Sequence, residues 1–532
     1  MYNPSLLFFA GNCRLLLKDG GAMLAFTRSV GLVGIGAFQV DVEVDLTRGL
    51  PTFTIVGLPD SAVKESRERV QAAIGNTGFS LPSKKLTVNL APAGRKKEGA
   101  AFDLPIAVGL LAASGFVSRE RASRYAYLAE LALDGSLRPV KGVLPMAAGL
   151  NGQGIDGFIV PAANAGEAVI ASPVPVYPAD NLEQVSLFLQ GLNNLKESGE
   201  TQILSNSQPA IADFSEVRGQ QQAKRALEIA AAGGHNVLMI GPPGSGKTML
   251  SARIPGILPP MSREEAVETT KVYSVAGLLP EGQALITRRP FRAPHHTVST
   301  PGLAGGGTNP RPGEVSLAHN GVLFLDEFPE FKRGALEVMR QPMESGKVVI
   351  SRAAASIELP ARFMLVAAMN PCPCGYLTHP TKACNCTASQ VQRYLGRISG
   401  PLLDRIDIHL EVLPVPRSEL SDPVSSGETS AVIRERVVEA RKIQTQRFKS
   451  NPGVYCNAHM TSTLTRRHCV LDSAARKLLD TAAARFGLSA RGYYRTLRVA
   501  RTIADLQGED TVQSDHIAEA VQYRALEKDY WV

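Results

Sequence analysis

The segment 236–250 constrains this chain more than any other, because its sequence NVLMIGPPGSGKTML matches the pattern GxxxxGK[ST]. An apolar, β-prone run at 237–240 leads into a loop rich in glycine and proline, and an amphipathic helical pattern comes next. The matching residues are Gly241, Pro242, Pro243, Gly244, Ser245, Gly246, Lys247 and Thr248. A strand, a glycine-rich turn and a helix in this order predict a phosphate-binding loop rather than an ordinary turn.

The residue types of this loop suit a nucleoside triphosphate. Glycines let backbone N–H groups curl around a phosphate, and the following helix presents its positively polarised N-terminus to it. Lys247 would contact the β- and γ-phosphates, and the Thr248 hydroxyl would ligate Mg²⁺. The expected cofactors are therefore ATP and Mg²⁺.

Two further apolar segments end in polar residues suited to hydrolysis. GVLFLDEF at 321–328 predicts a buried strand that ends in Asp326, a Mg²⁺ ligand, and Glu327, which would activate the attacking water. FMLVAAMNP at 363–371 predicts another strand that ends in Asn370, whose amide can bind the water or the γ-phosphate. Combined with the phosphate loop, these residues predict an ATPase.

Length, charge and cysteine content narrow the class of protein. The 532 residues allow two to four domains, and no apolar run is long enough to cross a bilayer. The 7 cysteines are an odd total, and with no convincing secretory signal they favour a reducing cytoplasm. The formal charge of +8 is compatible with polyanion binding, although charge alone does not establish it.

The sequence divides into five stretches. Residues 1–22 differ in character from the rest of the chain, so we expect them to be disordered or a misassigned start, with Met23 as a natural alternative. Alternating strand and helix patterns predict an N-terminal domain over 23–190, and polar residues predict a linker over 191–212. The ATPase domain is expected over 213–413, and helices with good N-cap residues over 414–532.

The N-terminal stretch resembles the ribosomal-protein-S5-like domain of the Lon protease catalytic region and of the RadA recombination protein. The resemblance is carried by KKEGAAFDL at 96–104 and LDGSLRPVKG at 133–142. On the Lon pattern the serine nucleophile falls at Ala101 and the lysine base at Leu144, and neither can do that chemistry. We therefore do not expect peptidase activity. Arg95, Lys96 and Lys97 either contact phosphates or form a solvated charged turn.

Residues between the phosphate loop and the acidic strand have two interpretations. RRPFRAPHHT at 288–297 contains Arg288, Arg289, Arg292, His295 and His296. They suit contact with a polyanion in a central channel, whereas metal binding is the less favoured alternative because two adjacent histidines lack a third ligand. Before the phosphate loop, Val217 and Gln220 stand where the entry turn of such ATPases packs against adenine.

Four cysteines are crowded into the segment after Asn370. Cys372, Cys374, Cys384 and Cys386 form two CxC pairs that could supply four thiolates to a structural Zn²⁺. The alternative is a cluster of reduced thiols, with His379 as a substitute ligand if a metal is bound.

Two arginines are candidates for sensing nucleotide. Arg405, between a predicted helix and strand, suits an arginine finger that reaches the γ-phosphate of the neighbouring subunit; the alternative is a salt bridge to Asp404 or Asp407. Arg491 best suits a second nucleotide-sensing arginine. Along the same predicted helix, the solvated face could be formed by Arg495, Arg498 and Arg501.

Taken together, six motifs resemble the magnesium-chelatase-like AAA+ family called YifB or ComM. They are GPPGSGKT, RAPHHT, GEVSLAHNGVLFLDE, MNPCPCG, PLLDRID and SARGYYR. The resemblance covers nearly the whole chain beyond residue 22. It implies an α/β fold: an AAA+ phosphate-loop ATPase core with a C-terminal helical lid and an N-terminal S5/Lon-like α+β domain.

The resemblance also implies a ring, expected to be a hexamer, with ATP at the subunit interfaces. Lys247, Thr248, Asp326, Glu327 and Asn370 would act within one subunit, Arg405 from its neighbour and Arg491 from the lid. The competence branch of the family is similar to hexameric helicases and is associated with branch migration during natural transformation.

The expected partners are single-stranded or branched DNA, further copies of the chain and recombination proteins, with no membrane. Two other functions stay open: a chelatase-type motor that drives a protein partner, and an ATP-dependent Lon-like protease, which Ala101 and Leu144 disfavour.

Overall fold

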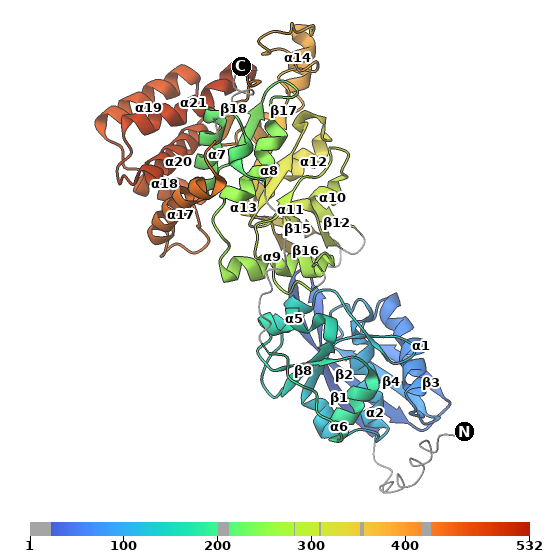
Figure 1. The fold of residues 1–532 in the computed structure, drawn as a ribbon. Coiled ribbons are helices and arrows are strands. Elements are labelled where there is room, and N and C mark those ends of the chain that lie inside the picture. The colour runs from blue at the N-terminus through green and yellow to red at the C-terminus, as the bar shows by residue number, and fades with distance from the viewer. Residues whose placement is uncertain are drawn as a thin grey trace, which may run out of the picture. The chain divides into compact units, whose positions relative to one another are not determined.

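The computed structural model describes residues 23–199, 212–280, 282–307, 310–351, 356–416 and 427–531. The predicted irregular start at 1–22 and most of the predicted linker at 191–212 lie outside these ranges. The chain divides into two units, Met1–Leu32 with Gly36–Thr201, and Val33–Ile35 with Gln202–Val532 (Figure 1). Both are mixed α/β, while the exact domain limits expected from the sequence stay predictions.

The N-terminal unit is built on a seven-stranded sheet. Its strands, in spatial order, are β3 (Thr52–Val56), β4 (Lys85–Ala91), β2 (Gly36–Thr47), β1 (Met23–Val33), β5 (Tyr125–Tyr127), β8 (Gly157–Pro161) and β9 (Val176–Ala179). β2 runs antiparallel to β4, whereas the pairs β1–β5, β5–β8 and β8–β9 are parallel. Val40, Val42 and Val44 of β2 are buried at every second position, as expected for a strand with one face on the core.

Six α-helices and a short ribbon complete the described part of this unit. The helices are α1 (Ser61–Asn76), α2 (Asp103–Ala113), α3 (Arg119–Ser123), α4 (Val143–Ala148), α5 (Ala162–Ala171) and α6 (Leu182–Gln190), and the ribbon pairs β6 (Glu130–Leu131) with β7 (Leu137–Arg138). Every residue of α2 is buried, so this helix is the centre of the core. Ala101 and Leu144, which stand at the protease positions, are also buried.

The basic turn at 95–97 is only partly solvated. Lys96 is paired with Glu98 at 2.8 Å, and Arg95 lies 5.0 Å from the centre of the Phe38 ring. Lys97 is fully buried, and its ammonium donates to the carbonyls of Gly57 and Pro92. Both interpretations of Lys97 from the sequence are therefore wrong, because its side chain is used to satisfy buried backbone carbonyls.

The C-terminal unit contains a five-stranded sheet that is parallel throughout. Its order is β11 (Phe291–Arg292), β14 (Val322–Leu325), β17 (Met364–Met369), β10 (Val237–Ile240) and β18 (Ile408–Glu411). Alternate residues along β10, β14 and β17 enter two separate hydrophobic cores, one on each face of the sheet. This two-sided burial explains the uninterrupted apolar runs in the sequence.

The same unit has short helices and ribbons around its sheet. The helices are α7 (Gln221–Gly233), α8 (Lys247–Ile257), α9 (Arg263–Ala276), α10 (Thr300–Ala304), α11 (Glu314–Leu317), α12 (Arg333–Val338), α13 (Arg340–Ser345), α14 (Ala388–Leu395) and α15 (Gly400–Leu403). The antiparallel ribbons pair β12 (Gly305–Gly306) with β13 (Arg311–Pro312), and β15 (Lys347–Ser351) with β16 (Ser356–Pro360).

Five C-terminal helices pack beside this sheet (Figure 1). They are α17 (Ser430–Arg447), α18 (Ser462–His468), α19 (Ser473–Phe486), α20 (Ala490–Gln507) and α21 (Ser514–Trp531). The expected solvated arginine face of α20 is wrong, because α7, α17 and α21 pack around this helix. Arg495 forms a 2.5 Å ion pair with Asp407, and Arg501 is 1% exposed and paired with Asp505. None of the described helices has the length and apolar character needed to span a membrane.

Asp103 provides a test of the N-terminal core. Its side chain is fully buried and accepts hydrogen bonds from Ser66 and the Leu131 backbone, while Arg69 pairs with it at 2.7 Å. We expect Asp103→Ala to lower the free energy of unfolding by about 3 kcal/mol, since three donors lose their acceptor. Glu98→Ala, which breaks an exposed ion pair, should lower the free energy of unfolding by less than about 1 kcal/mol. Urea titration of both variants measures these changes. Equal losses would contradict the importance of the buried acceptor.

Candidate nucleotide site

The polar residues of the candidate site lie at one edge of the parallel sheet. Ile240 of β10 is in register with Met369 of β17, and Leu325 of β14 with Ala367. The next residues along these strands therefore emerge side by side at the carboxyl edge. This edge is where parallel α/β sheets bind ligands.

The loop between β10 and α8 has the backbone of a phosphate cradle. Gly244 and Gly246 have φ angles of 78° and 93°, and no atom lies within 4 Å of the Cβ that either residue lacks. Gly241 is required for a different reason: a Cβ there would lie 2.1 Å from the carbonyl oxygen of Val412. The open space over the turn and the N-terminus of α8 fit a bound phosphate.

Lys247 is the cation of this cradle. Its side chain is 8% exposed and donates to the carbonyls of Gly241 at 2.7 Å and Pro242 at 2.9 Å. Its Nζ is also 3.4 Å from Oδ1 of Asn370, at the end of β17. Burial lowers the pKa of Lys247, while the charge of Asp326 acts in the opposite direction. A nucleotide phosphate would restore a full counter-charge to this ammonium.

Thr248 and Asp326 form the pair suited to Mg²⁺. The Thr248 hydroxyl donates to Oδ2 of Asp326 over 2.7 Å, so the two oxygens that would bind one ion are already adjacent. Hydroxyl and carboxylate oxygens are the ligands that Mg²⁺ takes in such sites. The residues present therefore fit both expected cofactors.

Glu327 is held by a residue that the sequence had not connected with it. Its backbone has a left-handed φ of 52°, and its N–H donates to Oδ1 of Asp326 over 2.9 Å. Nδ1 of His296 lies 2.9 Å from Oε2 of Glu327. The RAPHHT motif was a signal for function, but its spacing gave no indication that His296 faces the acidic strand.

Gln220 and Val217, the candidate adenine contacts, have different surroundings. Gln220 has a φ of 54° and donates through Nε2 to the carbonyl of Ser245 over 3.3 Å and to that of Leu413. It therefore connects the phosphate loop with the residues after β18. Val217 is 3% exposed and belongs to the hydrophobic core beneath α7.

Arg405 and Arg491 lie away from this edge. Arg405 precedes β18, at the amino edge of the sheet; it is 5% exposed and donates to Glu344 and to the Pro401 carbonyl. Its guanidinium is thus paired with Glu344 rather than with Asp404 or Asp407. Arg491 is 61% exposed in its side chain and lies 3.9 Å from the same Glu344. Neither arginine is placed to contact the phosphate loop of the same chain.

The four cysteines converge on one point. Three of the Sγ–Sγ distances are 3.4, 3.5 and 3.6 Å, and all four sulfur atoms lie within 4.8 Å of one another. A disulfide needs about 2.05 Å, whereas four thiolates around Zn²⁺ at about 2.3 Å are about 3.8 Å apart. The cluster therefore fits a tetrahedral ion, and backbone N–H groups, first that of Tyr376, lower the pKa of Cys374 to about 6. His379 lies outside this cluster, and its Nδ1 accepts hydrogen bonds from the backbone N–H groups of Thr381 and Lys382.

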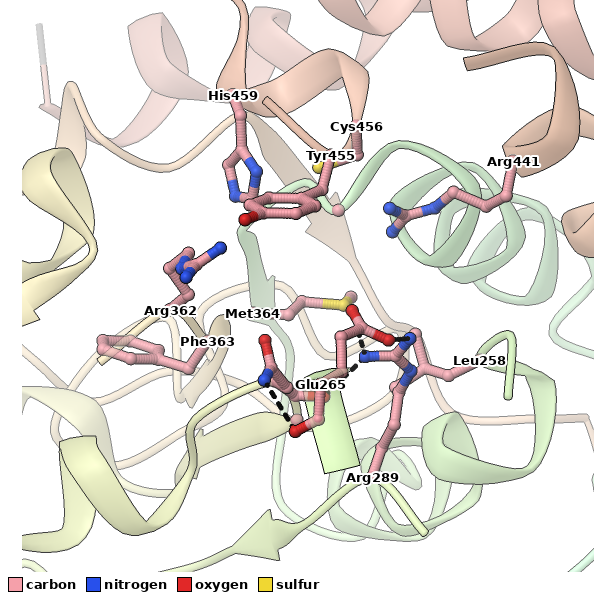
Figure 2. A pocket seen from close by; sticks show the side chains of 13 residues that line it. Leu258, Glu265, Arg289, Arg362, Phe363, Met364, Arg441, Tyr455, Cys456 and His459 are labelled. Carbon is pink, nitrogen blue, oxygen red and sulfur yellow. Dashed lines mark hydrogen bonds and ion pairs between the residues drawn. The ribbon is translucent and has the colours of Figure 1, made fainter. Parts of the chain in front are cut away.

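A cavity of about 70 Å³ lies at the opposite, amino edge of the sheet (Figure 2). Arg362 and Arg441 approach it from opposite sides, and Arg362 lies 4.5 Å from the centre of the Tyr455 ring. Arg289, one of the candidate polyanion contacts, is paired there with Glu265 at 2.8 Å. Arg292 is likewise paired with Glu314, so the structure uses both arginines internally.

Comparisons with known proteins agree with this geometry. Three family models match: "Magnesium chelatase, subunit ChlI" over 213–420, "Subunit ChlI of Mg-chelatase" over 42–164, and "Magnesium chelatase, subunit ChlI C-terminal" over 427–524. The Mg-chelatase 38 kDa subunit of Rhodobacter capsulatus is 25% identical over 58% of this chain and 85% of its own length.

Two relatives match over nearly their full length. The competence protein ComM of Haemophilus influenzae is 47% identical over 94% of this chain and 98% of that protein. The protein YifB of Salmonella typhimurium is 45% identical over 95% of this chain and 98% of that protein. The chain therefore belongs to the magnesium-chelatase-like ComM/YifB family of AAA+ proteins.

Proposed function

We propose that this protein is an ATP-driven DNA translocase that works as a ring, expected to be a hexamer, and promotes branch migration of recombination intermediates. The observation that carries the ATPase part is the meeting of Lys247, Thr248, Asp326 and Asn370 at one sheet edge. The family match supports ATP hydrolysis independently.

The described residues suggest how hydrolysis proceeds. Lys247 and the phosphate-loop amides bind the phosphates, Thr248 and Asp326 hold Mg²⁺, and Asn370 orients the γ-phosphate or the attacking water. Mg²⁺, when bound, offsets the negative charge of the β- and γ-phosphates. Glu327, whose side chain is 56% exposed and is aligned by His296, accepts a proton from the attacking water at its carboxylate.

The arginines at the amino edge suggest that each site is completed by a second subunit. Arg405 and Arg491 share Glu344 and face away from their own phosphate loop. A guanidinium from one chain that reaches the γ-phosphate of the next would stabilise the charge that develops during transfer. This requirement supports a ring rather than a monomer.

Two observations favour DNA as the partner of this motor. The relative from Haemophilus influenzae is named a competence protein, and the formal charge of +8 favours a polyanionic partner. A chelatase-type motor acting on a protein partner is the second candidate, because the three family models that match are all from magnesium chelatase. Stimulation of ATP hydrolysis by single-stranded or branched DNA separates the two.

Glu327→Gln tests the role of the general base. We expect it to lower kcat about 10²–10⁴-fold with and without DNA, because the amide cannot accept the proton, while ATP binding is retained. Glu330→Gln is the matched control: this glutamate is three residues away and pairs with Arg397 at 2.5 Å. Normal turnover in Glu327→Gln would exclude the role, and hydrolysis indifferent to every DNA tested would exclude the translocase.

Mixing two inactive variants tests the shared site. Arg405→Ala should lower kcat about 10³-fold or more with ATP binding retained, and Lys247→Ala should abolish binding. In a mixture, some interfaces pair an intact Lys247 with an intact Arg405, so partial activity should return. If each arginine served its own subunit, no mixture would exceed the sum of its components.

We infer also that the four cysteines bind structural Zn²⁺. The protein purified without chelator should carry about one zinc per chain, measured by elemental analysis, because four thiolates complete a tetrahedral shell. Cys372→Ser should lower that content, whereas His379→Ala should leave it unchanged, since His379 is not in the cluster. A wild-type protein that contains no zinc, with all four cysteines of the cluster present as free thiols, would contradict the assignment.

A further inference from the structure

The cysteine cluster is connected directly to the candidate nucleotide site by the chain. Cys372 follows Asn370 with only one residue between them, just after the end of β17. The loop closes at Thr387, whose side chain caps α14, and Tyr394 of that helix is buried in the core. Both ends of the cysteine loop are thus anchored, one of them beside the residue that contacts Lys247.

Gly375, the residue after Cys374, brings this loop into contact with the phosphate loop. Its φ is 83°, and a Cβ at this position would lie 2.6 Å from Cδ of Pro243 and 3.7 Å from Cγ of Asn370. The Gly375 N–H donates to the Cys372 carbonyl over 3.0 Å. This hydrogen bond closes a turn that contains both Cys372 and Cys374. One turn therefore lies against both Pro243 and Asn370.

The position of this turn depends on what holds the sulfur atoms together. Cys372 and Cys374 lie on the near side of the loop, and Cys384 and Cys386 return to them from the far side. Thiols form only weak hydrogen bonds, and adjacent thiolates repel each other. A bound Zn²⁺ would instead fix all four sulfur atoms and with them the turn.

We propose that Zn²⁺ bound by Cys372, Cys374, Cys384 and Cys386 holds Gly375 against Pro243 and Asn370, so that metal occupancy controls the rate of ATP hydrolysis. The proposal rests on the proposed ATPase function. The cysteines act as positioning residues: they set the place of Gly375, which lies against Pro243 and Asn370. Loss of zinc should therefore lower kcat more than it weakens ATP binding, because small displacements of catalytic groups affect the transition state most.

The first test removes the metal in the full-length protein. In Cys374→Ser/Cys384→Ser, zinc content should fall to near zero and kcat about 10–100-fold, while the Kd for a fluorescent ATP analogue changes little. Cys469→Ser is the control, because this buried cysteine lies outside the cluster and contacts the Leu497 carbonyl. Zinc loss with unchanged kcat would overturn the proposal.

The second test breaks the contact and keeps the ligands. Gly375→Ala should retain zinc but lower kcat about tenfold, since its methyl group displaces Pro243. Gly453→Ala is matched in backbone strain, because Gly453 has a φ of 88° but no atom within 4 Å of a built Cβ. Equal kcat values for the two variants would contradict the role of the contact between Gly375 and Pro243.

Hydrogen exchange separates this proposal from the ATPase proposal. Removing zinc from the wild-type protein with a chelator should raise amide exchange in both 371–387 and 241–248, whether or not turnover is detected. Absence of ATP hydrolysis in the zinc-loaded protein would reject the proposed function alone. Unchanged exchange in 241–248 after zinc removal would reject the coupling.

Discussion

The parallel pairing of β10 with β17, and of β17 with β14, is the constraint on which the candidate site depends. This register places Gly241, Asp326 and Asn370 at the ends of adjacent strands, although more than a hundred residues separate the first from the last. Parallel strands cannot be joined by tight turns, so the long crossovers between them are obligatory. The strands themselves are buried on both faces, so alternate side chains of each strand pack into the two hydrophobic cores.

The opposite edge of the sheet carries buried charge. Asp407 is almost fully buried, and the guanidinium of Arg495, together with His235 and the Asn236 backbone, keeps its pKa well below the usual range despite burial. Leaving either charge of such a pair unmatched would destabilise the fold. Arg405 is attached to this network, because its carbonyl accepts from Arg495 and from the Asn236 amide. Helix α20 therefore fixes the backbone of Arg405 through the side chain of Arg495.

The sequence predicted the elements whose chemistry is local and missed those that depend on packing. The phosphate loop, the acidic strand and the Asn370 strand follow from residue type and apolar runs, and the structure contains all three segments. Lys97, Arg495 and Arg501 were misplaced because a charged residue is normally solvated, and periodicity does not reveal a buried carbonyl or carboxylate partner. His296 approaches Glu327, and Arg362 and Arg441 line one cavity. The members of each pair are too distant in sequence for a residue pattern to connect them.

Asn370 shows why a strand end can serve two purposes at once. Its side chain faces Lys247, while the chain that leaves it enters the cysteine loop and returns to Pro243 through Gly375. Any force that tightens or loosens this loop is therefore applied to both walls of the phosphate site, because no flexible linker intervenes between Asn370 and Cys372. A structural ion placed on the far side of the molecule could stabilise the fold without this consequence. The cysteine cluster lies beside the phosphate loop instead, so an ion bound there would act on the geometry that the proposed hydrolysis requires.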